Sequence, residues 1–423
     1  MSSAAKPALT GGTPAVSLSH SPWPITGEQE VQWMEEVVRG GKWSWLGPHE
    51  EAFCREFAAF IGSEYALGLS NGTVTIQCAL QAAGVEPGDE VIVPGLTWVA
   101  TAQAALDIGA HVVLVDIDPE TYCIDPQALE AAITPRTRAV VPVHLYGCMC
   151  DMDAVTEIAG RHGLKIVEDV AHQHGSRWRD RGAGAIGDAG SFSFQQSKVL
   201  TSGEGGAITC NDEEIYNIAF SLKQVGWSPQ MQPAGHYGHN YRITEMQCVL
   251  LRGGLTRIEE QTAIREQSAL TLSEGLARIG GPLRAAGRDP RVTRQAYYAM
   301  TLHFDPALAE GLTRSQYFAA LAAEGLGLGA PYAPVYRNGL LNLYDRTSPV
   351  PYRDSAAVQD YANLKLPVVE RVCDQTGVVL MHNHLLAEPA YIDQLVQAVD
   401  KVNGSLAQIG RHLAATEAAA TTT

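Results

Sequence analysis

The sequence has few positive charges and no basic cluster. Its 423 residues carry a formal net charge of −16, and only 7 of its 30 basic residues are lysines. Nucleic-acid binding needs clustered lysine and arginine to meet the phosphates, so this composition argues against it. A dispersed acidic surface mainly favours solubility. Because lysine is scarce, a lysine placed among Gly, Ser and Phe stands out from its background.

The sequence also lacks the patterns of membrane, secreted and disulfide-rich proteins. No run of about 18 apolar residues occurs, so no membrane span is expected. The N-terminal residues contain no apolar core of a signal peptide. The eight cysteines form neither a disulfide framework nor a zinc spacing. Reduced thiols suit the cytoplasm, and this is the predicted location.

Two histidine pairs are the nearest approach to a metal motif. His172-Gln-His174 and His382-Asn-His384 would each place two imidazoles on one face of a strand. No cysteine or carboxylate completes either pair into a closed set of ligands, so no metal site is predicted.

Short apolar runs alternate with helical patterns over the first 260 residues. The predicted strands are 65–69, 90–93, 111–115, 138–143 and 164–168, and helical patterns cover 50–61 and begin at Thr73 and about Thr97. Continuous apolar strands between helices predict an α/β fold with a mainly parallel sheet covered on both faces. Ligands bind beyond the carboxyl ends of such strands.

After about residue 260 the pattern changes to that of a smaller α+β domain. Strands are predicted over 295–303 and 378–381, and helices over 313–324 and 389–402. The chain is too long for one small core. The predicted division is an N-terminal arm (1–27), a large domain (28–260), a small C-terminal domain (261–410) and a flexible tail (411–423).

Lys198 is the most informative residue. It follows the strand-like run Gly190–Ser193 and precedes the glycine-rich turn Gly203–Gly206. An amine in such surroundings can form an imine with an aldehyde, because small neighbours leave room for a cofactor. The turn matches neither a Walker A motif nor a dinucleotide fingerprint.

Asp169 ends another predicted strand. A lysine for an imine and an aspartate for a pyridinium nitrogen are the minimal set for pyridoxal phosphate. Asp169 could also cap a strand-to-loop turn. Glu168 would point to the opposite side of the strand, so only one of the two carboxylates can serve the ring.

Two segments suit the phosphate of such a cofactor. Ser70-Asn-Gly-Thr73 lies between a strand and a helix, where Gly72 lets the backbone approach an anion and the helix N-terminus offers free N–H groups. Asn-Gly is also a common turn, and Thr73 a common N-cap. Ser193 could donate to the phosphate or bond its own backbone.

Two further residues could contact the ring. Trp98 follows a strand end and could stack on a pyridine, although a single tryptophan often serves core packing. His172 could reach the phenolic oxygen of the cofactor, and it could equally be structural.

With these motifs in place, the chain resembles the sugar and aminocyclitol aminotransferases of the DegT/StrS type over roughly residues 28–400. The matching segments are Ser70–Thr73, Val93–Trp98, Glu168–His172, Ser193–Lys198, Gly203–Gly206 and Gly238–Arg242. Residues Gln195–Gly206 are most similar to the L-glutamine:scyllo-inosose branch, and His384–Leu386 resembles that branch more weakly.

The resemblance implies a fold-type I pyridoxal phosphate enzyme that acts as a homodimer with sites at the subunit interface. The roles it implies are Lys198 as the Schiff-base lysine, Asp169 at the pyridinium nitrogen, Gly72, Thr73 and Ser193 at the phosphate, Trp98 on the ring, His172 near the ring oxygen, and Asn240 at the phosphate of the neighbouring subunit's cofactor. The loop Lys42–Gly47 stands where relatives shape the substrate pocket.

The predicted function is transfer of an amino group from L-glutamine, or L-glutamate, to a keto-cyclitol or keto-sugar in aminoglycoside or other secondary-metabolite biosynthesis. Three alternatives stay open at this point. They are a nucleotide-keto-sugar aminotransferase that uses L-glutamate, a pyridoxal phosphate lyase or dehydratase on the same scaffold, and a non-catalytic regulator that binds the cofactor.

Overall fold

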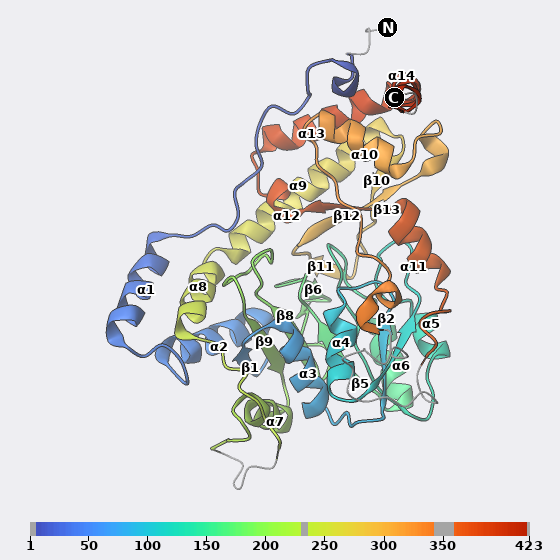
Figure 1. Cartoon of the computed structure of the whole chain (residues 1–423). Coiled ribbons are helices and arrows are strands. Elements are labelled where there is room, and N and C mark those ends of the chain that lie inside the picture. Colours follow the sequence, from blue (N-terminus) through green and yellow to red (C-terminus); the bar gives the residue numbers. More distant parts are fainter. Residues whose placement is uncertain (1–5, 230–235, 342–358, 421–423) are drawn as a thin grey trace.

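The computed structural model describes residues 6–229, 236–341 and 359–420, and its centre is a seven-stranded sheet (Figure 1). The strand order is β1-β9-β8-β5-β4-β2-β3. The strands are β1 (Tyr65–Leu69), β2 (Glu90–Pro94), β3 (His111–Val115), β4 (Thr137–Val140), β5 (Lys165–Asp169), β8 (Ala189–Ser193) and β9 (Gly206–Cys210). Only β9 runs antiparallel to its two neighbours, so the mainly parallel α/β sheet predicted from the sequence is confirmed.

Helices cover this sheet because its strands are apolar on both faces and need partners on each. The helices of this part of the chain are α1 (Glu28–Gly40), α2 (Pro48–Ile61), α3 (Gly72–Ala82), α4 (Ala100–Asp107), α5 (Pro126–Ala131), α6 (Met152–His162), α7 (Glu213–Lys223) and α8 (Glu245–Leu255). Of these, α1 packs mainly on α8, and α8 packs mainly on α2. The βα connections bring the ends of β1, β2, β5 and β8 to one edge of the sheet, where ligands bind in open α/β folds.

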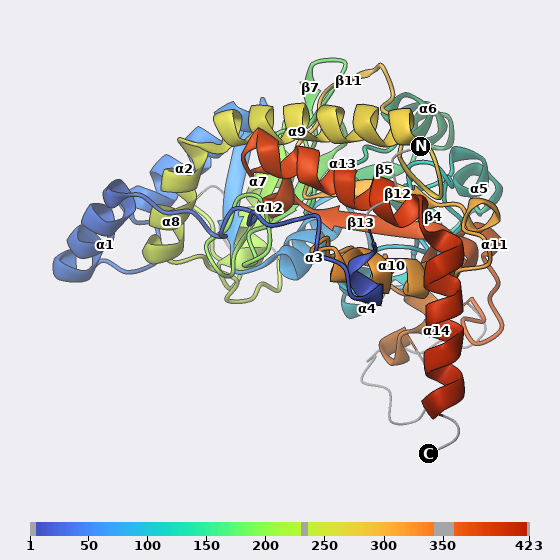
Figure 2. The same cartoon turned by 90° about the horizontal axis from the view of Figure 1, so that it is seen from above.

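A second, smaller core lies in the C-terminal part of the chain. A three-stranded antiparallel sheet, in the order β10-β12-β13, packs with helices. The elements are α9 (Ile258–Ile279), β10 (Leu283–Ala285), β12 (Ala299–Phe304), α10 (Arg314–Ala323), β13 (Gly377–Met381), α12 (His382–Leu385) and α13 (Pro389–Asn403). Seen from above, α9 and α13 lie side by side across this sheet (Figure 2).

Short elements join the two cores. A small sheet in the order β11-β6-β7 pairs Val292–Arg294 with Arg177–Trp178 and Arg181–Gly182. The helix α11 (Pro367–Arg371) and the turn Val372–Thr376 belong to the core of the large sheet. Single turns of 3-10 helix occur at Ala8–Thr10, Pro306–Leu308, Val335–Arg337 and Gly339–Leu341. The predicted domain boundaries stay a prediction.

The N-terminal arm runs along the smaller core as an extended segment before α1 (Figure 1). Its backbone N–H groups at Ala8 and Ala15 donate to the carboxylate of Glu324, and that of Ser17 donates to Gln394. These bonds fix an arm that has little secondary structure of its own.

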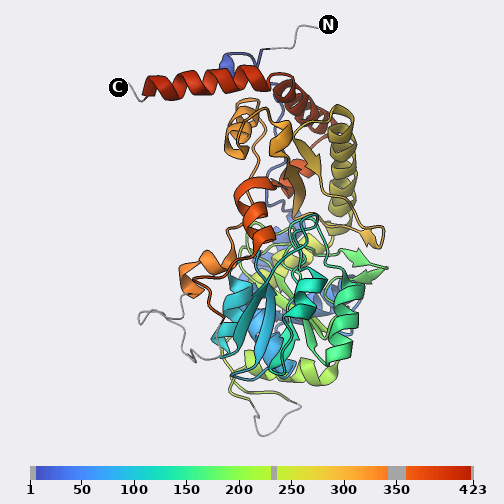
Figure 3. The same cartoon turned by 90° about the vertical axis from the view of Figure 1, so that its right-hand side faces the viewer.

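Part of the tail expected over 411–423 is helical, and its flexibility stays a prediction. Residues Leu406–Ala420 form the helix α14, which projects from the body of the molecule (Figure 3). Alanine is the best helix former, so an Ala-rich segment continues the helix even where few contacts support it. No helix in the described part of the chain is long and apolar enough to cross a membrane.

Candidate active site

A cavity of about 720 Å³ opens at the carboxyl edge of the large sheet. Seven of the eight predicted site residues line it, and they are Gly72, Thr73, Trp98, Asp169, His172, Ser193 and Lys198. They come from the ends of β1, β2, β5 and β8 and from the turns that follow. The fold therefore brings together residues that lie up to 126 positions apart in the sequence.

Lys198 reaches the cavity from the loop after β8. The loop turns back at once, because the backbone N–H of Lys198 donates to the carbonyl of Gln195. The side chain is 8% exposed, and its Nζ lies 4.5 Å from the ring centroid of Tyr298. Burial lowers the pKa of Lys198 from 10.5 to about 8, while the charge of Asp169 acts in the opposite direction. The neutral fraction of this amine near physiological pH is therefore much larger than that of an ordinary lysine.

Asp169, the last residue of β5, is held by two donors. Its Oδ2 accepts from the hydroxyl of Thr101 at 2.8 Å, and its Oδ1 accepts from the backbone N–H of Ala171 at 3.1 Å. Burial raises the pKa of Asp169, whereas these two hydrogen bonds favour the charged form. The carboxylate is thus oriented towards the cavity before any ligand arrives.

Glu168 points away from the cavity, as the alternation along a strand predicted. Its carboxylate accepts from the backbone N–H groups of Gly184, Ile186 and Gly187 and lies 3.0 Å from His144 Nε2. These donors lower its pKa against the effect of burial. Glu168 therefore anchors the segment before β8.

The N-terminus of α3 and the end of β8 form a narrow cradle. The side chain of Asn71 caps α3 by accepting from the N–H groups of Thr73 and Val74, each at 3.1 Å. A Cβ at Gly72 would lie 2.7 Å from the Cβ of Ser193. Gly72 is therefore required by the close approach of the two segments, beside a helix end that favours anions.

His172 is held flat against an aromatic wall. Its ring stacks on Tyr298 with centroids 4.0 Å apart, and its Nδ1 accepts the backbone N–H of Tyr146 at 3.1 Å. Burial holds the pKa of His172 well below its usual value. The ring is therefore neutral with its proton on Nε2. Trp98 is 58% exposed at the mouth, with its ring 5.4 Å from that of Tyr332.

Comparison with known proteins gives a consistent assignment. The model of the DegT/DnrJ/EryC1/StrS aminotransferase family matches residues 24–382. The chain belongs to this family. As a DegT/DnrJ/EryC1/StrS aminotransferase it depends on pyridoxal phosphate.

Curated proteins and solved structures are similar to this chain over most of its length. A Streptomyces kanamyceticus protein, provisionally named L-glutamine:3-amino-2,3-dideoxy-scyllo-inosose aminotransferase, is 39% identical over 96% of this chain and 98% of its own length. The L-glutamine:2-deoxy-scyllo-inosose aminotransferase of Streptoalloteichus tenebrarius is 37% identical over 93% and 97%. The crystal structure of 3-amino-5-hydroxybenzoic acid synthase is 33% identical, with a TM-score of 0.79, and covers 90% of this chain and 98% of its own.

The cavity of this aminotransferase fits its cofactor. It offers a lysine amine, a buried carboxylate with two fixed donors, and a glycine-lined cradle at the start of α3. These groups match the aldehyde, the ring nitrogen and the phosphate of pyridoxal phosphate, respectively.

Several residues of the aminotransferase site were not predicted from the sequence. Thr101, Tyr298 and Tyr332 all line the cavity. Thr101 sits one turn after Trp98, and this spacing could have suggested it. Nothing in the local sequence distinguishes the two tyrosines from core residues, because they reach the site only through tertiary packing.

Asn240 does not line the cavity of its own chain. It is exposed, and its backbone forms an isolated bridge with Gln224. Its predicted role at a neighbouring cofactor stays a prediction. Trp43 and Trp45, in the loop predicted to shape the substrate pocket, are each 53% exposed and also lie outside this cavity.

The expectation that the histidine pairs lie on strands is wrong. His172 and His174 lie in turns after β5, and His382 and His384 lie in α12. Among the described residues, no group of three or more His, Cys, Asp or Glu side chains is arranged to hold a metal ion.

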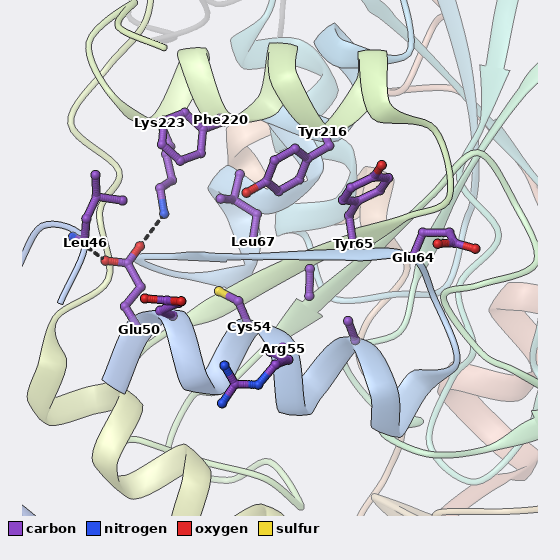
Figure 4. Close-up of a pocket in the computed structure, with 13 residues that line it drawn as sticks. Leu46, Glu50, Cys54, Arg55, Glu64, Tyr65, Leu67, Tyr216, Phe220 and Lys223 are labelled. Atoms are coloured by element: carbon purple, nitrogen blue, oxygen red, sulfur yellow. Dashed lines mark hydrogen bonds and ion pairs between the residues drawn. The ribbon is translucent and has the colours of Figure 1, made fainter. Parts of the chain in front are cut away.

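A second cavity of about 450 Å³ lies at the β1 edge of the sheet, between α2 and α7 (Figure 4). It contains another buried lysine, Lys223, whose Nζ donates to Glu50 Oε1 at 2.6 Å and to the carbonyl of Gly68 at 2.9 Å. No residue predicted from the sequence as catalytic lies there.

Proposed function

We propose that this aminotransferase moves the amino group of L-glutamine to a keto-cyclitol of the scyllo-inosose type, in the cytoplasm. The observation that carries the proposal is the cavity in which the amine of Lys198 and the carboxylate of Asp169 face a common space. The names of the similar relatives support the donor and the acceptor class.

Pyridoxal phosphate, when bound, carries the amino group from donor to acceptor and takes up negative charge from the reacting carbon. Lys198 would hold the aldehyde group of the cofactor. Its Nζ would also be the group that removes the proton from the donor's α-carbon and gives a proton to the acceptor's carbon. A pKa of about 8 suits both tasks, because the same amine must take and release a proton near neutral pH.

Asp169 would keep the ring nitrogen of the bound cofactor protonated. A buried carboxylate next to that nitrogen would stabilise its positive charge, because charges interact more strongly in a buried site than in water. The hydroxyl of Thr101 and the N–H of Ala171 fix the carboxylate in place. Neutral His172, with its proton on Nε2, can donate to the ring oxygen from beside the aromatic wall.

The charge of the cavity favours an uncharged acceptor. Among the described residues that line it, Lys198 is the only cation, whereas Asp107, Asp169 and Glu204 are acidic. A nucleotide-linked sugar carries a diphosphate, which needs cations or helix ends beyond those used by the cofactor. A cyclitol carries only hydroxyl groups, which the polar and aromatic lining can bind without a further cation.

The proposal is tested by a matrix of donors and acceptors with the purified enzyme. The donors are L-glutamine and L-glutamate, and the acceptors are scyllo-inosose, 2-deoxy-scyllo-inosose, 3-amino-2,3-dideoxy-scyllo-inosose and a nucleotide-linked keto-sugar. We expect kcat/KM with L-glutamine and one inosose to exceed every nucleotide-sugar combination by at least about 100-fold. A preference for the nucleotide sugar would replace the proposed acceptor, and elimination products without amine transfer would indicate a lyase or dehydratase.

The resemblance also supports a homodimer in which Asn240 of the partner subunit reaches the phosphate. Asn240 is exposed and lies outside its own cavity, so it is free to serve a neighbour. Mixing the Lys198→Ala and Asn240→Ala variants tests this arrangement. A mixed dimer with shared sites has one intact site, so about a quarter of wild-type activity should return at equal mixing. No gain over the separate variants would contradict the shared site.

A further inference from the structure

Arg265, on α9, is a buried cation without a counter-ion. It is fully buried, and its Nε and Nη1 have no hydrogen-bond partner among the described residues. Its Nη2 makes a single long bond of 3.4 Å to Gln261 on the same helix. No described carboxylate pairs with it, and burial lowers its pKa to about 9. An uncompensated buried charge destabilises a fold, so stability does not explain this residue.

Two histidines near Arg265 hold the loop that carries Lys198. His174 Nε2 lies 2.9 Å from the carbonyl oxygen of Ser193, and His382 Nε2 lies 3.1 Å from that of Ser197. A carbonyl oxygen can only accept, so each Nε2 must carry a proton. In the neutral rings the two Nδ1 atoms are then acceptors, and both are buried without a partner among the described residues.

The N-terminal arm packs against the same loop and against His382. Trp23 donates its indole N–H to the carbonyl of Gln196 at 3.1 Å, and its ring meets that of His382 edge-on at 4.6 Å. The guanidinium carbon of Arg265 lies 5.8 Å from the Trp23 ring centroid. Three backbone carbonyls around the loop that carries Lys198, those of residues 193, 196 and 197, thus accept hydrogen bonds from side chains of three different segments.

Arg265 and the two histidines are chemically complementary. Arg265 has unused N–H donors, whereas each imidazole has an unused acceptor. Burial, together with a smaller contribution from the charge of Arg265, lowers the pKa of both His174 and His382 to about 3. Water both donates and accepts, and it is the molecule that commonly joins such buried groups.

We propose that Arg265 is a positioning residue for Lys198. Through ordered water it fixes His174 and His382 as neutral donors to the loop, and the loop then holds the Lys198 amine in the cavity. The inference rests on the proposed role of Lys198, and it explains why a costly buried charge is present 67 positions further along the chain.

The test compares Arg265→Met and Arg265→Lys with Arg278→Met, an exposed arginine near the end of the same helix. Three quantities are measured: the thermal midpoint of the cofactor-free protein, hydrogen exchange of the backbone amides over 194–198, and kcat and KM with L-glutamine. For Arg265→Met we expect an unchanged or higher midpoint, because an unpaired charge is removed. Exchange in the loop should become about 10-fold faster, and kcat should fall about 10-fold or more with KM within about 2-fold.

The remaining variants and outcomes decide between positioning and general support. Arg265→Lys restores a donor and a charge, so it should recover part of the loop protection and of kcat, and Arg278→Met should match the wild type throughout. A midpoint that falls together with activity, without selective exchange in the loop, would overturn the proposal in favour of a structural role. Unchanged exchange and kcat in Arg265→Met would also overturn it. The exchange experiment needs no catalysis, so it also separates the two proposals. If the wild-type protein shows no transaminase activity but Arg265→Met still loosens the loop, the proposed function is refuted and the link between Arg265 and the loop stands.

Discussion

Two buried lysines in this chain have opposite environments. Lys223 is fully buried, and its Nζ is bonded to the Glu50 carboxylate and the Gly68 carbonyl (Figure 4). Lys198 is almost as buried, but no hydrogen bond or ion pair joins its Nζ to any residue that the structure describes. It faces an open cavity and the ring of Tyr298.

The comparison shows that burial alone does not make a lysine reactive. The N–H groups of Lys223 are already used, because they donate to a carboxylate at 2.6 Å and to a carbonyl at 2.9 Å. Glu50 in turn accepts the backbone N–H of Leu46, so the pair ties α2, β1, α7 and the preceding loop together. The amine of Lys198 has a lowered pKa and space beside it, which are the two requirements of a nucleophile.

The largest expected effect follows from replacing Lys198. Lys198→Ala removes the proposed attachment and proton-transfer group, so we expect kcat to fall by about 10⁴-fold or more. The variant should also lack the visible absorbance of lysine-linked pyridoxal phosphate while its thermal midpoint stays close to that of the wild type. Turnover within about tenfold of the wild type would refute the role.

Replacing the other lysine should act on stability instead. Lys223→Met leaves the buried Glu50 carboxylate unpaired, so the free energy of unfolding should drop by about 3–5 kcal/mol in a denaturant titration. The double variant Lys223→Met/Glu50→Gln removes both charges and should be less destabilised than the single one. The fraction that stays folded should keep its cofactor absorbance and its turnover. A Lys223→Met protein as stable as the wild type would show that the pair contributes little.

Asp169→Asn removes the negative charge of this side chain and keeps its shape. Asparagine can keep the bond from Thr101 but cannot stabilise a protonated ring nitrogen, so kcat should fall by about 10²–10³-fold and the cofactor should be held more weakly. Asp107→Asn is the matched control, because Asp107 lines the same cavity and bonds Gln77 rather than any of the predicted site residues. Equal effects of the two substitutions would mean that the charge of Asp169 has no special role.

The smallest predicted effect is a pH profile. Only a neutral amine attacks an aldehyde, so the rate at which cofactor-free protein captures pyridoxal phosphate should rise about tenfold per pH unit below the pKa of Lys198 and level above it. The pKa of about 8 places this change well below that of an ordinary lysine at 10.5. A rate that keeps rising beyond pH 10 would contradict the effect assigned to burial.

Much of the large domain could be predicted from the sequence, because its strands are apolar runs with a helix after most of them. The strand predicted from Gln295 begins only at Ala299, since Tyr297 has a left-handed φ of 51°, which interrupts an extended strand. The meeting of Lys198 and Asp169 in one cavity was predictable, because each residue ends a recognisable local pattern. The residues around this pair were harder to predict. The spacing after Trp98 could have suggested Thr101, whereas Tyr298 reaches the pair only through tertiary contacts.

Arg265 illustrates the same limit. In the sequence it is one basic residue in a helix rich in Glu, Gln and Arg, and such residues are usually exposed. Its burial arises only when the arm carrying Trp23 and the helix carrying His382 pack against α9. No local pattern contains that information.

The difference between the two lysines can be measured directly. Protein loaded with pyridoxal phosphate is reduced with borohydride, which makes the lysine linkage permanent, and the modified peptide is then identified by mass spectrometry. The account predicts the label on Lys198 alone, with none on Lys223. A label on Lys223 or another lysine, or no label in protein that retains transaminase activity, would contradict it.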